Sequence, residues 1–179
     1  LDVTGITVFG LTVNNKIYDG TATAPLDTSN ISYSGLVEGD DFTGTYTGVF
    51  ADANVGTNKT VTITPTYSGT DTSNYTVTDQ SSTTANIIVK TLTATASSSD
   101  KTYDATNAAT TTLTLSGLVG TETLNITNTS TFNNKNVGTG KSVTVNSITL
   151  ADGTGLAANY SISPGQTTMA DVTAKSLTV

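Results

Sequence analysis

The sequence predicts an all-β chain of two tandem repeat domains, and three observations support this. Short runs that alternate apolar with small or polar residues recur throughout, each bounded by Gly, Asn, Asp or Ser as strands are. No window shows the i, i+3, i+4, i+7 spacing of an amphipathic helix. Motifs of the first half return in the same order in the second half.

The first half opens with residues 5–13, in which apolar side chains alternate with small or polar ones, the period of a half-buried strand. Tyr18-Asp19-Gly20 then predicts a turn, because Gly takes a positive φ at little cost. Five further alternating runs predict strands at residues 31–37, 42–50, 59–67, 75–78 and 84–89.

The repeat is defined by four pairs of matching segments. Lys16-Ile-Tyr-Asp-Gly20 matches Lys101-Thr-Tyr-Asp-Ala105, Ser34-Gly-Leu-Val37 matches Ser116-Gly-Leu-Val119, Phe50-Ala-Asp-Ala-Asn-Val-Gly-Thr-Asn-Lys59 matches Phe132-Asn-Asn-Lys-Asn-Val-Gly-Thr-Gly-Lys141, and Asn74-Tyr75 matches Asn159-Tyr160. They predict one domain at residues 1–89 and a second at residues 90–179. The stretch 84–95, which closes one domain and opens the next, has a second copy at 169–179, so we expect a piece of a longer tandem array.

The composition excludes several classes of function. Cys, His, Trp and Arg are absent. The chain therefore has no disulfides, lacks the commonest general base and metal ligand, and lacks the guanidinium group that binds phosphate through two hydrogen bonds. A net charge of -7 argues against nucleic acid and against anionic membranes as partners. Because no apolar run is long enough to span a bilayer, we expect no membrane insertion, with any export signal or anchor outside these residues.

The motif set resembles a known family. Lys-x-Tyr-Asp-Gly, then Phe-x-x-x-Asn-Val-Gly-Thr-x-Lys, then Asn-Tyr and a closing Lys-x-Leu-Thr is similar to the YDG-type repeat of large secreted and surface proteins of bacteria, many of them adhesins. The resemblance covers nearly the whole chain twice and implies an extracellular array on the bacterial surface, without naming a ligand. The second repeat departs at Ala105, where a left-handed turn would cost an alanine about 1 kcal/mol, so we expect this turn to differ.

Several repeated residues invite a structural and a functional interpretation. Tyr75 and Tyr160 follow Asn at a strand start, where a tyrosine packs its ring in the core and bonds its hydroxyl to a nearby loop; the alternative is a platform on which a sugar stacks. The structural interpretation is favoured, and Tyr18 and Tyr103 are interpreted in the same way. Gly56 and Gly138 predict turns, since the helix and the Gly-Lys-Ser/Thr sequence of a phosphate loop are missing. The paired lysines are surface amines in one interpretation and form Lys-Asn isopeptide bonds in the other, which needs a buried Lys, an Asn and an acid together.

Acidic residues concentrate in the first domain, and Asp40, Asp41 and Asp71 are its candidate calcium ligands. No Asp-x-Asp-x-Asp-Gly loop accompanies them, so solvated loop carboxylates are the favoured interpretation and no cofactor is expected. No nucleophile and base pair or paired-acid site supports an enzyme.

The favoured architecture is two β-sandwich domains with Ig-like or Greek-key connections; a β-grasp-like unit is the alternative, disfavoured because no helix is found. We expect a structural stalk or spacer of a bacterial adhesin whose partners are the neighbouring repeats. The alternative is a repeat that itself binds a host or matrix ligand, either a glycan or a protein. Residues 87–95 hold no Gly and no Pro, which predicts a stiff, extended domain pair.

Overall fold

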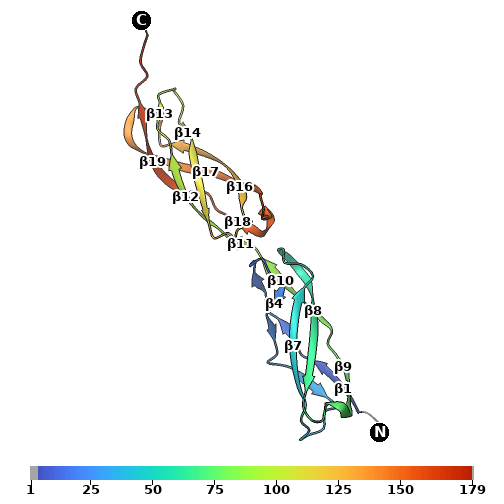
Figure 1. Cartoon of the computed structure of the whole chain (residues 1–179). Coiled ribbons are helices and arrows are strands. Elements are labelled where there is room, and N and C mark those ends of the chain that lie inside the picture. Colours follow the sequence, from blue (N-terminus) through green and yellow to red (C-terminus); the bar gives the residue numbers. More distant parts are fainter. Residues whose placement is uncertain (1–3, 179) are drawn as a thin grey trace. The chain divides into compact units, whose positions relative to one another are not determined.

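The structure is a computed structural model that describes residues 4–178. Its chain divides into two compact units, Leu1–Val89 (unit 1) and Lys90–Val179 (unit 2). Both are built from strands, and the described residues contain two short 3-10 turns but no α-helix (Figure 1). No helix of the described part is therefore long and apolar enough to cross a membrane.

Unit 1 contains a large sheet and two smaller ones. Its strands are β1 (Thr4–Phe9), β2 (Thr12–Val13), β3 (Lys16–Ile17), β4 (Thr23–Ala24), β5 (Leu26–Asp27), β6 (Ser32–Ser34), β7 (Thr43–Phe50), β8 (Gly56–Ser68), β9 (Tyr75–Thr78) and β10 (Ser82–Ile88). The five-stranded sheet has the order β3-β10-β8-β7-β4, the three-stranded sheet β6-β1-β9, and β2 pairs with β5. The 3-10 turn η1 (Thr72–Asn74) precedes β9.

Unit 2 repeats this plan with differences in the smaller sheets. Its strands are β11 (Lys90–Thr91), β12 (Thr93–Ser98), β13 (Lys101–Thr102), β14 (Ala108–Ala109), β15 (Thr111–Ser116), β16 (Leu124–Phe132), β17 (Gly138–Asp152), β18 (Tyr160–Ser161) and β19 (Thr167–Thr173), with η2 (Ala157–Asn159) before β18. The five-stranded sheet β13-β19-β17-β16-β14 matches that of unit 1. The smaller sheet of unit 1 is divided here into β12-β15 and β11-β18.

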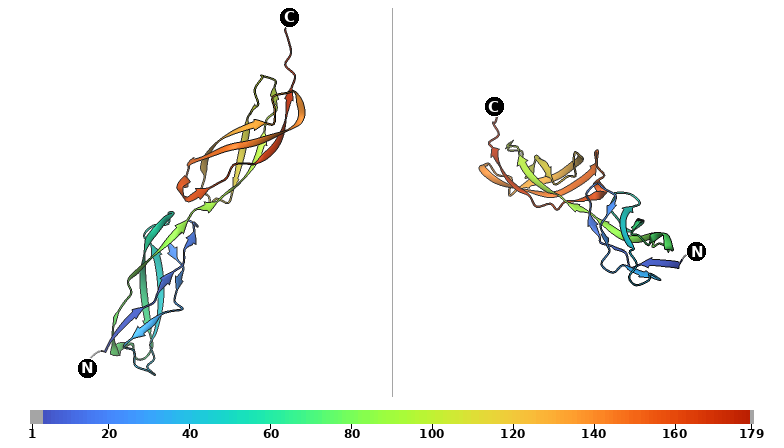
Figure 2. Two further views of the ribbon diagram at one scale, coloured as in Figure 1. Left: turned by 180° about the vertical axis from the view of Figure 1, so that it is seen from behind. Right: turned by 60° about the horizontal axis from the view of Figure 1, so that its bottom comes forward.

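Antiparallel hairpins form the middle of each large sheet, and parallel pairs form one edge. The long hairpins are β7-β8 and β16-β17, whose strands run side by side and twist (Figures 1 and 2). Four pairs are parallel: β1 with β9, β3 with β10, β11 with β18, and β13 with β19. In each unit the chain's opening segment thus pairs alongside its closing segments.

The opening segment also links the sheets, which makes each unit partly barrel-like. In unit 1 this segment contributes β1 to the small sheet and then β3 to the edge of the large sheet. It bends between them at Gly10, whose φ is +91°. A Cβ atom there would lie 2.1 Å from the carbonyl oxygen of Asn30, so only glycine fits.

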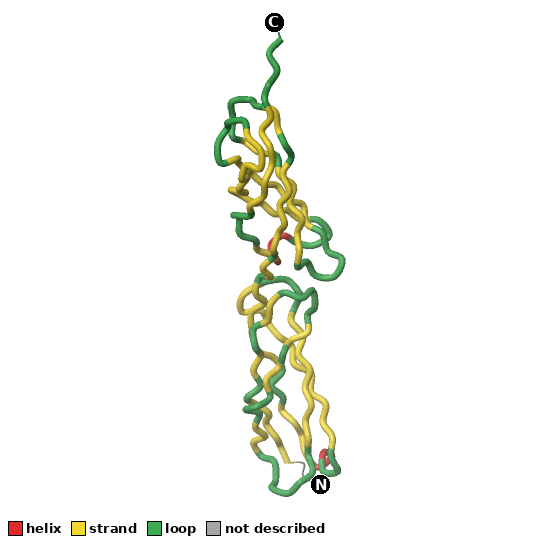
Figure 3. The backbone as a smooth tube through the Cα atoms, turned by 90° about the vertical axis from the view of Figure 1, so that its left-hand side faces the viewer, coloured by secondary structure: helices red, strands yellow, loops and turns green. Residues whose placement is uncertain are grey.

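Apolar side chains on alternate strand positions fill the interior of each unit. Thr60 to Thr64 on β8 show the pattern, since Val61 and Ile63 are buried between exposed threonines. The most buried large side chains include Phe50 and Ile87 in unit 1 and Phe132 and Val143 in unit 2. The strands run along each unit, and the 3-10 turns lie among end loops (Figure 3).

The prediction of an all-β chain without α-helices is confirmed for the described residues, and the boundaries differ locally. Residues 75–78 form β9 as predicted, whereas the strand expected at 5–13 is split at Gly10 into β1 and β2. The strand expected at 31–37 ends at Ser34, because Gly35 also has a positive φ. The two-residue strands β3, β4 and β5 were not predicted, since two residues show no periodicity.

Candidate functional site

The Lys-x-Tyr-Asp motif of unit 1 surrounds a lysine ammonium with oxygen atoms. Lys16 Nζ lies 2.7 Å from Asp19 Oδ1 and donates to the carbonyl oxygens of Thr21 at 2.8 Å and Thr23 at 3.0 Å. It also donates to Thr21 Oγ1 at 3.0 Å and lies 5.9 Å from the centroid of the Phe50 ring. We call this arrangement the lysine clamp of unit 1.

Unit 2 contains the same arrangement. Lys101 Nζ lies 2.8 Å from Asp104 Oδ1, donates at 3.0 Å to the carbonyl oxygens of Thr106 and Ala108, and lies 5.8 Å from the ring centroid of Phe132. The hydrogen bond from Lys101, followed by those from Thr106, holds the pKa of Asp104 well below its usual range. The lysine clamp therefore favours the ionised form of this aspartate in the folded state.

The lysine clamps join opposite edges of the five-stranded sheets. Lys16 stands on β3 at one edge, and the carbonyl of Thr23 belongs to β4 at the other edge. In unit 2, Lys101 on β13 reaches Ala108 on β14 in the same way. Because each clamp replaces backbone pairing between the two edges, it closes a sheet that would otherwise expose unpaired strands.

A second pair of lysines closes the turns of the long hairpins. Lys59 Nζ lies 2.6 Å from Asp52 Oδ1, which also accepts the backbone N–H of Asn54 at 2.8 Å. In unit 2 the acceptor is the amide oxygen of Asn134, 2.5 Å from Lys141 Nζ. These contacts account for the Asn-Val-Gly-Thr-x-Lys motif, in which the lysine holds an Asx turn five to seven residues earlier.

Lys141 and Asn134 are two of the three groups that an isopeptide bond requires. Lys141 is buried, and its other hydrogen bond, at 2.5 Å, is to the carbonyl oxygen of Asn136. Within the described residues, no carboxylate forms an ion pair or hydrogen bond with Lys141, so the acid that would transfer protons is not supplied at this turn. The contact is accounted for as a hydrogen-bonded turn.

Tyr75 and Tyr160 occupy equivalent buried positions, as predicted. Each hydroxyl accepts a backbone N–H from the Ser-Gly-Leu-Val motif, that of Val37 at 3.1 Å and that of Val119 at 3.0 Å. Each also donates to an acid, Asp40 at 2.5 Å and Glu122 at 2.6 Å. Tyr18 is buried as well, whereas Tyr103 is only partly buried.

Sequence reasoning did not identify Asp40 and Glu122 as hydrogen-bond partners of these tyrosines. A repeated signal was present, because Asp40 and Glu122 each stand three residues after the valine of Ser-Gly-Leu-Val. Phe50 and Phe132, which cover the lysine clamps, carried a similar signal as the start of the hairpin-turn motif. Their role required knowledge of which strands meet across the sheet.

The three calcium candidates lie near one another and bond to protein groups. Asp40 accepts the Tyr75 hydroxyl, Asp71 Oδ2 accepts the backbone N–H of Asp41 at 2.8 Å, and Asp41 Oδ2 accepts the backbone N–H of Thr70 at 3.0 Å. No group of three or more potential metal-ligating side chains is arranged around a common point in residues 4–178. The carboxylates serve as loop acceptors in this geometry.

Calcium is therefore expected to be dispensable for stability. We expect the melting temperature of the chain to be the same in 5 mM calcium, in magnesium, and in an excess of chelator. A site present at about 100 times its dissociation constant would instead add about 2.7 kcal/mol to the free energy of unfolding. A calcium-dependent rise in melting temperature that Asp71→Asn removes would contradict this expectation.

Unit 1 carries an aromatic cluster that predicts sensitivity to alkaline pH. Burial and then the bond to Asp79 raise the pKa of Tyr67 to about 12. Burial and then the bond to Tyr33 raise the pKa of Tyr46 above that of Tyr67. A tyrosine whose pKa is raised in the folded state stabilises it fully below the unfolded value near 10 and loses that contribution as pH rises through the folded value. We therefore expect unit 1 to lose stability progressively above about pH 10.

Thermal melting between pH 8 and pH 12, followed by circular dichroism, measures this loss. In unit 2, burial and then Glu122 raise the pKa of Tyr160, and the register position of Tyr67 is held by Leu150, which has no ionisable group. Unit 1 should consequently melt first at pH 11, and Tyr67→Phe should reduce the slope of its melting temperature against pH. Equal slopes for the two units, unaffected by this substitution, would contradict the assignment.

Ala105 corrects the expectation that its turn would differ from that of unit 1. Gly20 has a φ of +78° and Ala105 a φ of +66°, so the turns share the left-handed conformation. In both, the aspartate accepts the backbone N–H two residues later, at 2.9 Å. The lysine clamp holds the turn in this shape, and Ala105 retains the conformational strain.

Replacing Ala105 with Gly should therefore stabilise unit 2 by about 1 kcal/mol. The reciprocal change, Gly20→Ala, should destabilise unit 1 by a similar amount. Urea denaturation of the two variants measures both changes against the same parent chain. A destabilising Ala105→Gly would mean that the entropy of the unfolded glycine outweighs the relief of strain.

Comparison with known protein families finds the YDG domain twice, over residues 4–85 and 88–169. No curated protein and no solved structure matches the chain significantly. The matched ranges contain both lysine clamps, both hairpin-turn lysines and both buried tyrosines. The repeated contacts described above are thus those of a shared domain architecture, and the chain belongs to the YDG domain family as a tandem pair.

Proposed function

We propose that this tandem pair is a structural stalk or spacer segment of a bacterial cell-surface or secreted adhesin. The observation that carries the proposal is the parallel pairing of opening with closing segments in both units, β3 with β10 and β13 with β19. Such a segment would be extracellular, would have its neighbouring repeats as partners, and would perform no catalysis. A spacer of this kind has to resist tension applied through its two ends.

Parallel pairing of the end strands resists such tension by geometry. In a parallel pair, the pulled end of the first strand and the pulled end of the last strand lie at opposite ends of the ladder. Tension then loads the hydrogen bonds together, whereas in an antiparallel pair it would break them one after another. The lysine clamps stand on the loaded strands, Lys16 on β3 and Lys101 on β13, and tie each to the far edge of its sheet.

Single-molecule force measurements test the proposal, because forced unfolding reports the height of the unfolding barrier. With handles at the two termini, we expect two unfolding events that each release about 300 Å of contour length, from about 3.5 Å per residue. The control places handles at Thr43 and Ser68, which are antiparallel register partners in the long hairpin of unit 1. End-to-end rupture at forces no higher than this unzipping control would overturn the mechanical role.

The extended arrangement of the two domains is a separate part of the proposal. It rests on the junction, which contains neither Gly nor Pro between residues 87 and 95. Small-angle scattering should then give an elongated particle with one narrow distribution of lengths. A compact pair that buries about 1,000 Å² between domains, or a broad distribution of lengths, would remove the spacer role and leave direct binding of a host or matrix ligand as the better proposal.

We also propose that each unit is related to Ig-like Greek-key sandwiches. The supporting observation is the buried tyrosine whose hydroxyl accepts a backbone N–H from a distant loop, at Val37 in unit 1 and Val119 in unit 2. The parallel edge pairs, and the opening segment that contributes β1 to one sheet and β3 to another, depart from a simple two-layer arrangement. An experimental structure with the strand order of another fold class would decide against this relationship.

A further inference from the structure

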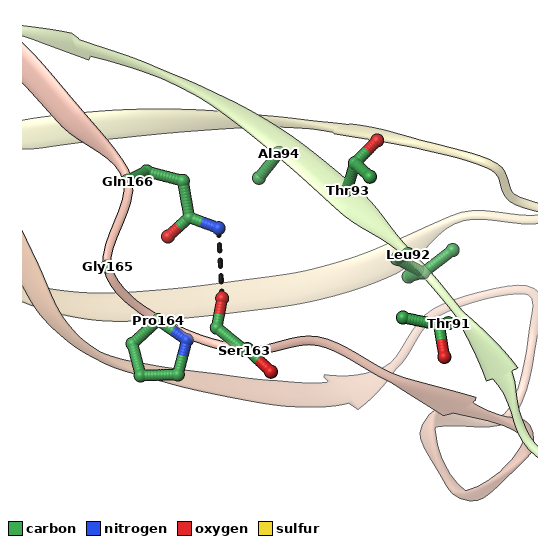
Figure 4. A pocket seen from close by; sticks show the side chains of 8 residues that line it. All are labelled: Thr91, Leu92, Thr93, Ala94, Ser163, Pro164, Gly165 and Gln166. Carbon is green, nitrogen blue, oxygen red and sulfur yellow. Dashed lines mark hydrogen bonds between the residues drawn. The ribbon is translucent and has the colours of Figure 1, made fainter.

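Unit 2 contains a slot between two of its own segments, whereas the equivalent segments of unit 1 pair with each other and leave no slot. The slot has a volume of about 430 Å³ and lies between two segments of unit 2, Thr91–Ala94 and Ser163–Gln166 (Figure 4). The first segment runs from the end of β11 to the start of β12, and the second lies in the connection between β18 and β19. Both walls of the slot are therefore formed by segments of a single unit.

The corresponding segments of unit 1 are paired. There β1 and β9 form four parallel register pairs, from Thr4↔Tyr75 to Thr7↔Thr78. In unit 2 the ladder starts in the same way at Lys90↔Tyr160 but stops at Thr91↔Ser161. After the last bond, from Leu92 N–H to the carbonyl oxygen of Ser161 at 2.7 Å, the two segments separate.

Sequence differences between the units explain the separation. Counted from the matching tyrosines, Asp79 and Gln80 of unit 1 correspond to Pro164 and Gly165. Proline has no N–H for the ladder, and glycine cannot replace the Gln80 side chain, whose amide bonds Leu11 N–H at 3.0 Å and Leu11 C=O at 2.7 Å.

The β12 side of the slot also differs from the equivalent strand of unit 1. By strand register, the buried Val8 of unit 1 corresponds to Ala94, which is smaller and leaves room in the slot. In unit 1, Asp79 is also held by the hydroxyl of Tyr67. The residue in the register position of Tyr67 is Leu150, which cannot form such a bond.

Two groups at the slot are available for hydrogen bonds. Side chains and backbone groups alternate along a strand, so the N–H of Ala94 faces the same side as that of Leu92, toward the slot. Gln166 Oε1 is buried and has no hydrogen-bond partner in the described structure. Its Nε2 donates to the carbonyl oxygen of Ser163 at 2.9 Å, the dashed line in Figure 4, and this bond holds the amide at the slot.

We propose that this slot binds an extended, uncharged peptide segment, which adds to β12 as a parallel strand. The chemistry of the occupant follows from unit 1, where β9 covers the equivalent edge with Val77 and Thr78. Their counterparts in unit 2, Ile162 and Ser163, lie beyond the end of the ladder. A bound segment of this kind directs its central apolar side chain toward the space above Ala94. Its backbone bonds β12, and a backbone N–H reaches Gln166 Oε1.

Titration of the isotope-labelled 179-residue chain with acetyl-Thr-Val-Thr-amide tests this proposal by NMR. We expect saturable shifts at the backbone amide of Ala94 and the side-chain amide of Gln166, with a dissociation constant on the order of 1 mM for so short a peptide. Hydrogen exchange at Ala94 should slow in the complex. The corresponding amide of Val8 in unit 1 should neither shift nor change its exchange rate.

Two matched controls make the result specific. Ala94→Val restores the side chain present in unit 1 and should weaken binding at least tenfold, whereas Thr112→Val, on the exposed face of β15, should leave it unchanged. A peptide N-methylated at its C-terminal threonine lacks the N–H that would bond the carbonyl oxygen of Ala94 in the ladder and should not bind. No shift at 10 mM peptide, or shifts that persist with the N-methylated peptide, would overturn the proposal without affecting the force and scattering tests.

Discussion

Replacing Tyr160 with alanine is expected to lower the free energy of unfolding of unit 2 by about 3 kcal/mol. The ring is buried, with 5% of its surface exposed, so its removal leaves a cavity in the end of the unit that includes η2. Loss of the hydroxyl also removes the hydrogen bonds that it makes with the N–H of Val119 and the carboxylate of Glu122. Urea denaturation followed by circular dichroism measures the change.

Tyr160→Phe separates the hydroxyl from the ring and should cost about 1 to 2 kcal/mol. Tyr75→Ala is the matched variant in unit 1, because its hydroxyl has the same two kinds of partner. Each alanine variant should shift the transition of its own unit and leave the other in place. A loss below about 1 kcal/mol for Tyr160→Ala would show that the ring position is filled by neighbouring side chains and is not essential to the core.

Replacing Lys101 with methionine is expected to lower the stability of unit 2 by about 2 kcal/mol, because hydrogen bonds to a charged group contribute more than neutral ones. Methionine keeps the apolar stem that lies against Phe132 but cannot donate to the carbonyl oxygens of Thr106 and Ala108. The edges β13 and β14 then lose their connection. Urea denaturation provides the measurement here too.

Lys135→Met is the control for Lys101→Met, since Lys135 is exposed in the same unit and its loss changes the net charge equally. The pH dependence gives a second test. A depressed pKa of Asp104 stabilises the fold above the unfolded value near 3.9, and this contribution is lost as pH falls toward the folded value. Lys101→Met should therefore flatten the acid limb of the stability curve, and equal losses for both lysine variants would contradict a role for the clamp.

The sequence alone was sufficient for the features that depend on local periodicity and on repetition. Alternation along residues 59–67 predicts the buried Val61 and Ile63 of β8, because strand side chains alternate between faces whatever the strand pairs with. The repeated Asn-Tyr identified Tyr75 and Tyr160 as core residues, since a large ring near a strand start gains most by burial. The tandem organisation followed from the order of the motifs, and the family match agrees with it.

Only the tertiary structure decided which segments meet, because those contacts join residues far apart in the chain and leave no periodic signal. The parallel pairs β3-β10 and β13-β19 join residues about 70 positions apart, and each lysine clamp depends on the strands those pairs bring together. Ala105 keeps its left-handed turn because the clamp outweighs a local preference of about 1 kcal/mol. The slot beside Ala94 likewise arises from changes on two separated segments, and neither segment predicts it without the other.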